Sequence, residues 1–415
     1  MGLFGEVERD IDAIRLPQWG RVIETTTVVP FEVVGPEGQA VEAIHGYLRD
    51  FTARGRRPGS VRSYAYDLLR WWRWLGVIEV EWDKATSAEV RDFVLWLQRV
   101  PKERRVPRTT SAALVGTINP ITRKQYPDDQ YKVRTVRHSN AVLRSFYEYW
   151  IERGLGPLVN PVPLDRAAGR RPNSHHNPLE KFRHEGRLRY NPPIPKRRPR
   201  AIPDQRWDEL FAALQSDRDR AMVSLAISNA IRAGELLGIR GADVDWGDQL
   251  VRVRRKGSGA EQWLPASAEA LVWLRLYVDH IGNVGASEPL WWTLRRRRPA
   301  GAALERQPLN YDALRAVFRR VNASLGTNWS MHDLRHTCAL RMLRDQNLSL
   351  RDIQTVLGHL HLSTTQTYLE EEPEEVIRRV HQHLTDRQRA DSRPPVPAQG
   401  YKVTDLAVLF GEDSR

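Results

Sequence analysis

The chain contains little cysteine and no long apolar run. Its single cysteine, Cys338, excludes an internal disulfide framework and any zinc site built from several thiolates. No stretch of 18 or more apolar residues occurs, so we expect no transmembrane helix. The opening residues, MGLFGEVERDIDAIRL, lack the basic start and the apolar stretch of a secretory signal. We therefore expect a cytosolic protein.

Acidic residues are outnumbered by basic ones. Lys and Arg total 64 against 51 Asp and Glu, which gives a formal net charge of +13. This surplus favours a polyanionic partner, with nucleic acid and an anionic membrane surface as the first candidates. Because 41% of the 415 residues are hydrophobic, the chain can also bury cores of its own, and its length fits two or three domains.

Hydrophobic periodicity predicts a mainly α-helical chain. Apolar residues recur at helical spacing in SVRSYAYDLLRWWRWLG, where Gly76 is the expected helix cap. Similar patterns follow Ser87 and extend over residues 136–152. Four prolines within residues 101–131 predict a long, partly ordered insertion instead.

Two short stretches predict β-structure, which makes the expected fold α+β with a small sheet or hairpin. Residues 21–34 are rich in β-branched side chains, but Pro30 limits them to an edge strand or hairpin. Val251 and Val253 alternate with arginines before a glycine-containing turn and an extended stretch at residues 263–264. This second pattern predicts a hairpin.

Changes in composition predict five segments. These are an N-terminal arm (1–38), a helical unit (39–165), a basic proline-rich linker (166–200), a second, mostly helical unit (201–390) and a C-terminal tail (391–415). The linker carries the strongest local charge, since residues 170–200 contain ten Arg and Lys against two acids. We expect it to follow a phosphate backbone, with Arg197, Arg198 and Arg200 as contacts, although a solvated connector is the alternative.

Three stretches of the second unit could carry chemistry. Arg232 and Glu235 are three residues apart, so the carboxylate can hold the guanidinium, and His332 and Arg335 share the same spacing. Taken alone, each pair is ordinary. Ser349 is a plausible N-cap for a helix that Gly358 closes, so the next residue, His359, is expected at an exposed helix end. A capping box at residues 363–366 then starts a short helix that contains Tyr368 and can move relative to the core.

In order, these residues resemble the catalytic signature of the tyrosine recombinase (phage integrase) family. The signature positions are Arg232, Lys256, His332, Arg335, His359 and Tyr368, and the strings HDLRHT and LGHLHLSTTQTY are similar to that family's most characteristic strings. The resemblance covers residues 200–390, and the helical unit at 40–160 resembles the family's SAM-like core-binding domain more loosely. One departure is SNAI before Arg232, where the family usually has a Thr-Gly turn. The resemblance implies a C-shaped clamp on DNA.

The resemblance implies DNA cleavage and rejoining through a covalent intermediate. Tyr368 would attack a backbone phosphorus, giving a 3′-phosphotyrosyl link and a free 5′-hydroxyl. Arg232 and Arg335 would clamp the non-bridging oxygens, because forked guanidinium hydrogen bonds strengthen as negative charge grows there. His332 would assist the tyrosine proton, and His359 would hydrogen-bond a phosphate oxygen.

The remaining roles follow from the same resemblance. Lys256, beside a glycine-rich hairpin tip, would protonate the departing 5′-oxygen, and Glu235 would orient Arg232. We expect no cofactor, because the phosphotyrosine stores the bond energy and no G-x-x-x-x-G-K-[ST] loop occurs. We also expect no metal site, since His175, His176 and His184 lie in the basic linker.

The resulting hypothesis is a site-specific DNA recombinase that acts on double-stranded DNA as a homotetramer. Accessory recombination proteins are further candidate partners, and the expected location is the cytoplasm, at the nucleoid. Length and insertions favour an integrase or transposase of a mobile element. Two alternatives stay open: a type IB topoisomerase-like enzyme and a non-catalytic DNA-binding protein of the same fold. The apolar stretch 403–410 is either a docking element for a neighbouring protomer or a frayed tail.

Overall fold

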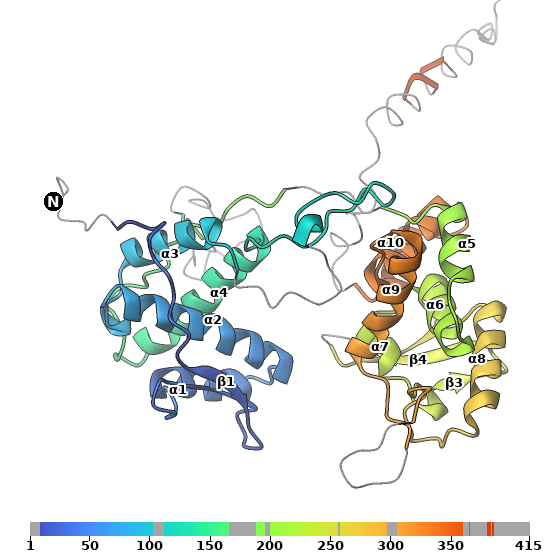
Figure 1. Ribbon diagram of the computed structural model, residues 1–415, viewed down its shortest axis with the longest axis horizontal. Coiled ribbons are helices and arrows are strands. Elements are labelled where there is room, and N and C mark those ends of the chain that lie inside the picture. Colours follow the sequence, from blue (N-terminus) through green and yellow to red (C-terminus); the bar gives the residue numbers. More distant parts are fainter. Residues whose placement is uncertain are drawn as a thin grey trace, which may run out of the picture. The chain divides into compact units, whose positions relative to one another are not determined.

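The computed structural model divides the chain into two compact units (Figure 1). It describes residues 9–102, 112–165, 188–195, 200–255, 258–296, 305–359, 365, 380–382 and 384–385. Unit 1 comprises Met1–Ile118 and Gln125–Lys196, and unit 2 comprises Asn119–Lys124 and Arg197–Arg415. Each unit has its own hydrophobic core. A short segment from the first half of the chain therefore belongs to the second unit.

Unit 1 is a helical bundle with a small hairpin packed on its first two helices. Its elements are β1 (Arg21–Glu24), β2 (Phe31–Val34), α1 (Glu42–Ala53), α2 (Pro58–Val77), η1 (Trp82–Lys84), α3 (Ser87–Arg99), η2 (Ala112–Leu114) and α4 (Val133–Ile151). The two strands pair antiparallel, with Arg21 opposite Val34, and Pro30 lies in the loop before β2. The predicted hairpin in residues 21–34 is confirmed, and the proline is tolerated because it stands outside the ladder.

Aromatic side chains fill the core of unit 1. Trp71 and Trp74 of α2 are fully buried, and so are Phe146 and Tyr147 of α4. The indole of Trp71 donates a hydrogen bond of 2.9 Å to the Tyr147 hydroxyl, so the polar edges of the two rings satisfy each other. Large rings at helical spacing on α2 and α4 therefore fix how these helices pack.

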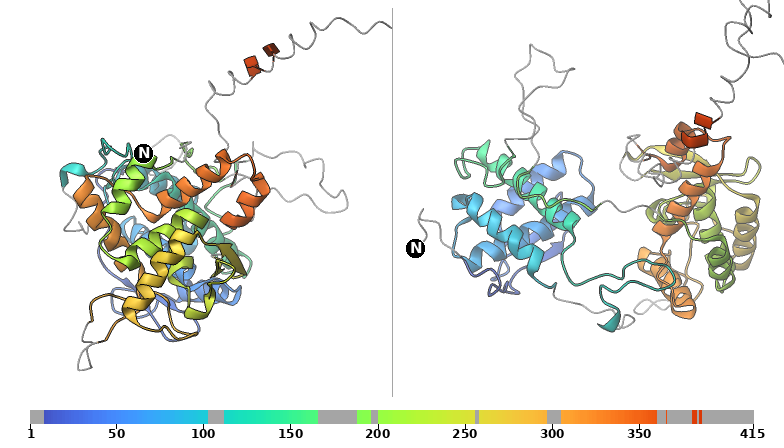
Figure 2. Two further views of the ribbon diagram at one scale, coloured as in Figure 1. Left: turned by 90° about the vertical axis from the view of Figure 1, so that its right-hand side faces the viewer. Right: turned by 90° about the horizontal axis from the view of Figure 1, so that it is seen from above.

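Unit 2 combines helices with a three-stranded sheet (Figure 2). Its elements are α5 (Asp204–Ala212), α6 (Asp217–Asn229), α7 (Ala233–Leu237), η3 (Gly241–Asp243), β3 (Val244–Asp245), β4 (Leu250–Arg254), β5 (Glu261–Pro265), α8 (Ala268–Ile281), α9 (Tyr311–Leu325), α10 (Met331–Arg344) and α11 (Leu350–Leu357). The strands run antiparallel in the order β3-β4-β5, with Val251 opposite Leu264. Helix α6 packs against both α8 and α10. The hairpin predicted around residues 251–264 is confirmed.

The predicted fold class is confirmed, whereas one predicted helix end is wrong. Gly76 lies inside α2, because the helix continues to Val77 and the Ile78 N–H still bonds the Trp74 carbonyl. The left-handed residue that follows is Glu79, with φ of 55°. Glycine thus stands at a helix interior position that faces Trp19 rather than at the cap. None of the helices in the described part of the chain is long and apolar enough to cross a membrane.

Candidate active site

A left-handed turn after α6 places Arg232. Ala230 has φ of 55°, a conformation that costs a residue with a Cβ about 1 kcal/mol or more. The Asn229 side chain stabilises the turn, since its Oδ1 accepts from the Ile231 N–H and its Nδ2 donates to the Pro265 carbonyl. In the SNAI sequence, alanine therefore occupies the left-handed position where glycine is the usual residue, and asparagine stabilises the turn.

Glu235 forms an ion pair with the Arg232 guanidinium. Arg232 is the N-cap of the short helix α7, and Glu235 Oε2 accepts from its backbone N–H at 3.1 Å. Oε1 of the same carboxylate lies 2.8 Å from Arg232 Nη1. The Glu235 side chain is 1% exposed and that of Arg232 is 27% exposed. The predicted pair is thus present, with the carboxylate buried and part of the guanidinium at the surface.

Arg335 is a buried cation. It lies on α10 and is 3% exposed. Its Nη1 donates to the Ala230 carbonyl at 2.6 Å and its Nη2 to the Leu357 carbonyl at 2.7 Å. Nη2 also lies 2.9 Å from His359 Nε2. These contacts fix the plane of the guanidinium against the ends of α6 and α11.

His359 follows α11, whose two predicted caps are confirmed. Ser349 and Asp352 form a capping box, and Gly358 ends the helix with φ of 59°. The prediction of an exposed ring is wrong, because the imidazole is held between Arg335 and Thr365, whose Oγ1 lies 2.9 Å from Nδ1. Burial first, and then the charges of Arg335, Arg232 and Arg255, lower the pKa of His359 to about 4. The ring is therefore neutral at pH 7, and Nε2 can accept from Arg335.

Two histidines lie on one face of α10. The rings of His332 and His336 meet edge to face, with centroids 4.2 Å apart. Burial lowers the pKa of His332, opposed by Asp333 and assisted by Arg335, Lys124 and Arg232. Burial and the neighbouring His332 lower the pKa of His336 to about 4. The sequence alone offered no reason to assign His336 a role. Its position four residues after His332, which places both rings on one helix face, is the signal that could have pointed to it.

Four predicted site residues converge in unit 2. Arg335 contacts His359 and the Ala230 carbonyl, two residues before Arg232, and it lies three residues after His332 on α10. They come from three separate stretches, namely the turn before α7, helix α10 and the end of α11. The result is a group of two arginines and two neutral histidines, which suits an anion whose charge increases during a reaction.

Several predicted residues lie outside the described residues. These are Tyr368, Lys256, Arg197 and Arg198, together with most of the basic linker and the C-terminal tail. The strands that flank Lys256 in sequence, β4 and β5, are described. Arg200 is exposed and donates from Nη1 to the Arg123 carbonyl at 3.2 Å.

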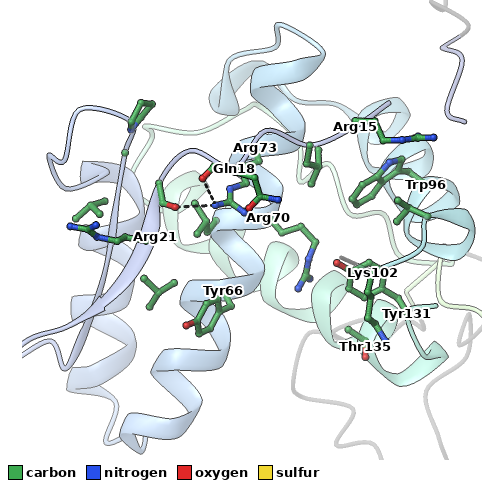
Figure 3. Close-up of a pocket in the computed structure, with 18 of the residues that line it drawn as sticks. Arg15, Gln18, Arg21, Tyr66, Arg70, Arg73, Trp96, Lys102, Tyr131 and Thr135 are labelled. Atoms are coloured by element: carbon green, nitrogen blue, oxygen red, sulfur yellow. Dashed lines mark hydrogen bonds between the residues drawn. The ribbon is translucent and has the colours of Figure 1, made fainter. Parts of the chain in front are cut away.

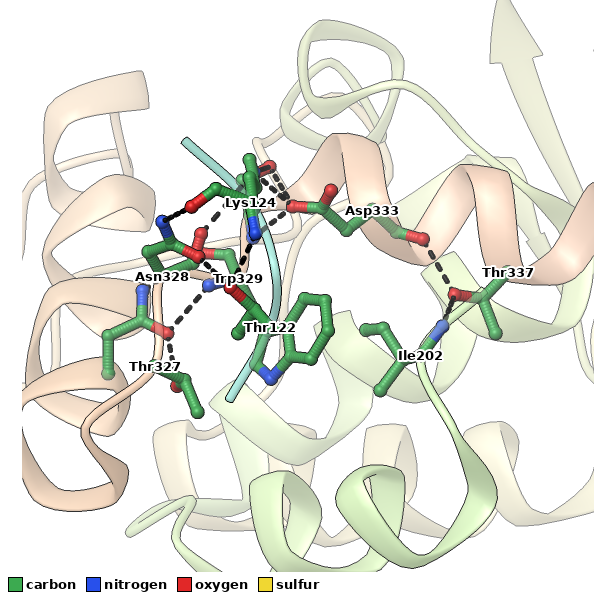
Figure 4. A network of polar contacts seen from close by, with 10 residues as sticks. Thr122, Lys124, Ile202, Thr327, Asn328, Trp329, Asp333 and Thr337 are labelled. Carbon is green, nitrogen blue, oxygen red and sulfur yellow. Dashed lines mark hydrogen bonds and ion pairs between the residues drawn. The ribbon is translucent and has the colours of Figure 1, made fainter. Parts of the chain in front are cut away.

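The segment Asn119–Lys124 contacts the start of α10 (Figure 4). Lys124 Nζ lies 2.6 Å from Asp333 Oδ2, which also accepts from the Ser330 N–H at 2.8 Å as part of the α10 capping box. The Asn119 side chain donates to the Gly326 carbonyl at 2.8 Å, and its Oδ1 accepts from the Thr122 N–H. The predicted insertion thus supplies part of the support for the helix that carries His332 and Arg335.

A cationic pocket lies in unit 1, with a volume of about 1460 Å³ (Figure 3). Its basic lining residues are Arg15, Arg21, Arg70, Arg73 and Lys102, and Glu37 is an acidic one. Three of the arginines are already engaged, since Arg73 donates to the Gly20 carbonyl at 2.9 Å, Arg70 pairs with Asp67 at 2.6 Å and Arg15 donates to the Asp12 carbonyl at 2.6 Å. Burial lowers the pKa of Lys102, whose Nζ lies 5.1 Å from the centre of the Tyr131 ring. The pocket suits an anionic ligand or a segment of phosphate backbone.

Within the described residues, no group of three or more His, Cys, Asp or Glu is arranged to hold a metal ion. Cys338 is 2% exposed, and burial raises the pKa of its thiol to about 12. It packs as a small buried apolar residue.

The histidine pKa values predict that stability falls with acidification. Unfolded histidines bind protons near pH 6.5, whereas folded His336 and His359 do so only near pH 4. Stability is therefore lost as the pH falls through this interval, by about 1–2 kcal/mol per ring once solvent access is allowed for. Urea unfolding of the full chain at pH 7 and pH 5 measures the loss, and His336→Gln should reduce it. An unchanged loss in that variant would contradict the prediction.

The contact of Lys124 with Asp333 gives a second prediction. Lys124→Met removes a partner of a largely buried carboxylate and should lower the free energy of unfolding by about 1 kcal/mol. Because Lys124 lowers the pKa of His332, the variant should also raise that pKa, which NMR titration of the ring measures. Lys132→Met, at an exposed lysine of unit 1, is the control. Equal effects of the two substitutions would contradict a specific role for Lys124.

Comparisons with known proteins point to one family. Residues 202–375 match the model of the phage integrase family, and residues 44–118 match the N-terminal SAM-like domain of phage integrases. Tyrosine recombinase XerC of Myxococcus xanthus is 26% identical over 343 residues, covering 79% of this chain and 91% of the relative. XerC of Chromobacterium violaceum is 31% identical over 185 residues, which span 43% of this chain and 58% of that relative.

Among solved structures, the fold is similar to that of the Tn1549 transposon integrase bound to circular intermediate DNA. The TM-score is 0.54 at 12% identity, and the match covers 82% of this chain and 98% of the integrase fragment. At this identity the likeness concerns the fold. The two family models, matched in chain order over residues 44–118 and 202–375, carry the assignment: the chain belongs to the tyrosine recombinase (phage integrase) family of site-specific DNA-recombining enzymes.

Proposed function

We propose that this chain cuts and rejoins double-stranded DNA at a specific site through a 3′-phosphotyrosyl intermediate. The observation that carries the proposal is the convergence of Arg232, His332, Arg335 and His359 in unit 2. These groups match the charge that develops at a phosphodiester under attack by an oxygen nucleophile.

The two arginines are proposed to bind the phosphate. A pentacovalent phosphorus carries extra negative charge on its non-bridging oxygens. Guanidinium groups stabilise this charge, because their forked N–H groups donate two hydrogen bonds at a fixed angle. Glu235 holds Arg232, and two backbone carbonyls hold Arg335, so neither needs to reorganise when the phosphate binds. Such preorganisation is the main source of transition-state stabilisation at charged centres.

The two histidines are proposed to act in their neutral form. A neutral imidazole can accept the phenol proton, which is the role we assign to His332. His359 would donate to a phosphate oxygen from Nε2, which requires the ring proton on that nitrogen and the phosphate in place of the Arg335 contact there. Their lowered pKa values keep both rings unprotonated near neutral pH.

Tyr368 and Lys256 complete the proposed reaction. The Tyr368 oxygen forms a bond to phosphorus while the bond to the 5′-oxygen breaks, and Lys256 gives that oxygen its proton. The support is their place in the sequence signature and the described hairpin on either side of Lys256. In the reverse step the 5′-hydroxyl of a partner strand attacks the phosphotyrosine and releases Tyr368.

DNA is the proposed partner of both units. The net charge of +13, the basic linker with Arg197, Arg198 and Arg200, and the cationic pocket of unit 1 all favour contact with a phosphate backbone. We further propose a homotetramer on two synapsed duplexes, accessory recombination proteins as added partners, and action at the nucleoid in the cytoplasm. The chain's length and its insertion favour an integrase or transposase of a mobile element.

Replacement of the nucleophile is the direct test of this function. Tyr368→Phe should abolish covalent capture of a nicked DNA substrate, because the attacking oxygen is absent, while the Kd for DNA stays within about threefold. Gel separation of the covalent adduct measures capture, and fluorescence anisotropy measures binding. An adduct that persists in this variant would reject Tyr368 as the nucleophile.

Plasmid relaxation, strand exchange and adduct formation by the unaltered chain together separate the two alternatives. A topoisomerase-like enzyme would relax supercoiled plasmid without joining strands of different duplexes. A non-catalytic DNA-binding protein would bind DNA and yield no adduct from the unaltered chain.

The dependence of DNA affinity on salt tests the basic contacts. Each lost phosphate contact should reduce the slope of log Kd against log salt by about 1. Arg21→Gln with Lys102→Gln tests the pocket, and neutralising Arg197, Arg198 and Arg200 tests the linker. Lys84→Gln, which alters a 70%-exposed side chain of unit 1 outside the pocket, is the control. A slope that none of these changes alters would remove both surfaces from the DNA interface.

A further inference from the structure

A buried arginine at the end of β4 contacts three parts of unit 2. Arg255 Nη1 lies 3.2 Å from Glu235 Oε2, and its Nε donates to Gln262 Oε1 at 2.7 Å. Its Nη2 donates to the Val356 carbonyl, near the end of α11, at 2.5 Å. The side chain is only 5% exposed. One guanidinium therefore joins α7, the β4–β5 hairpin and α11.

Each of these three parts carries a residue of the proposed reaction. Glu235 also holds Arg232, so the carboxylate stands between two guanidiniums. Helix α11 leads directly into His359, and Arg255 precedes Lys256 in the chain.

Burial makes these contacts necessary. Removal from water lowers the pKa of the Arg255 guanidinium, and the charge of Glu235 opposes that effect. The α11 carbonyls carry the negative end of the helix dipole, so a cation at this end is favourable. A buried charge persists only with such partners, and deletion of one partner leaves the others unsatisfied.

Gly358 shows how closely the chain approaches this guanidinium. A Cβ at this position would lie 2.7 Å from Arg255 Nε and 2.9 Å from Cζ. Glycine is thus required twice, for its left-handed backbone and for the space that Arg255 occupies. The residue before His359 and the residue before Lys256 are therefore packed against each other.

We propose that Arg255 is a positioning residue. It fixes the positions of three parts of unit 2 relative to one another: the Arg232–Glu235 pair, the strand leading to Lys256 and the turn leading to His359. This inference rests on the proposed function, since it concerns the alignment of its groups. Arg255 acts through these neighbours and needs no contact with DNA. Lysine cannot replace it, because a single ammonium lacks the fork that reaches Glu235, Gln262 and Val356 together.

The test compares two adjacent arginines. Arg255→Gln should slow formation of the covalent adduct by about 10–100-fold, the usual cost of losing a group that orients a reacting residue. Arg254→Gln is the matched control, because Arg254 is 50% exposed and pairs with Glu261 at the surface. We expect the control to cleave within about threefold of the unaltered chain, and both variants to keep the Kd for DNA within about threefold.

A second substrate distinguishes positioning from loss of the fold. A 5′-phosphorothiolate leaves without a proton, so it should rescue Lys256→Ala and reduce the defect of Arg255→Gln at least several-fold. A merely destabilised protein would be equally slow on both substrates. If Arg255→Gln does not fold, Arg255→Lys is measured instead, and it should also lose about tenfold on the ordinary substrate.

The outcomes separate this inference from the function on which it rests. Adduct from the unaltered chain and equal adduct from Arg255→Gln would overturn the role of Arg255 alone. A defect of the same size on both substrates would overturn the part of the inference that concerns the strand leading to Lys256. No adduct from the unaltered chain would overturn the proposed function and, with it, the role of Arg255.

Discussion

The hydrogen bonds of the buried Arg335 guanidinium are the constraint on which the site depends. They join the carbonyl of Ala230, after α6, to the carbonyl of Leu357, at the end of α11, and one of them reaches His359. Each carbonyl belongs to a helix end that would otherwise lack a donor. The cation therefore completes two helices while it orients an imidazole. A shift of α10 would disturb all three contacts at once.

The electrostatic design of unit 2 follows from the same arrangement. Arg232 and Arg255 share the buried carboxylate of Glu235, and Arg335 adds a third cation beside His359, so the local charge is positive before any ligand arrives. Protonated histidines would repel these arginines. Because the pKa values of His336 and His359 are lowered, both rings are neutral at neutral pH and this repulsion does not arise. The cost of burying these cations is offset within the protein, so binding of an anion gains the full benefit of groups that are already aligned.

Local signals in the sequence predicted local features well. The N-cap at Ser349, the Gly358 cap and the hairpin at residues 251–264 depend on neighbours a few positions away. Gly76 misled because a helix can continue through glycine where an adjacent side chain packs against it. The contacts of His359, Arg255 and Lys124 could not be predicted, because their partners are 20 to more than 200 positions distant. The motif supplied the identities of the reacting groups, whereas tertiary contacts set their burial and charge.

The assignment of Asn119–Lys124 to unit 2 bears on how the protein can be divided. A C-terminal fragment starting in the basic linker would lack these residues, and Asp333 would lose the ammonium group that neutralises it. The turn after α9 would likewise lose the amide that bonds the Gly326 carbonyl. A division of the chain at the linker therefore does not separate the two units completely. During synthesis on the ribosome, Asn119–Lys124 emerge before the rest of unit 2, and their partners on α9 and α10 follow much later. Complete folding of unit 2 therefore depends on a segment that is synthesised well before the rest of that unit.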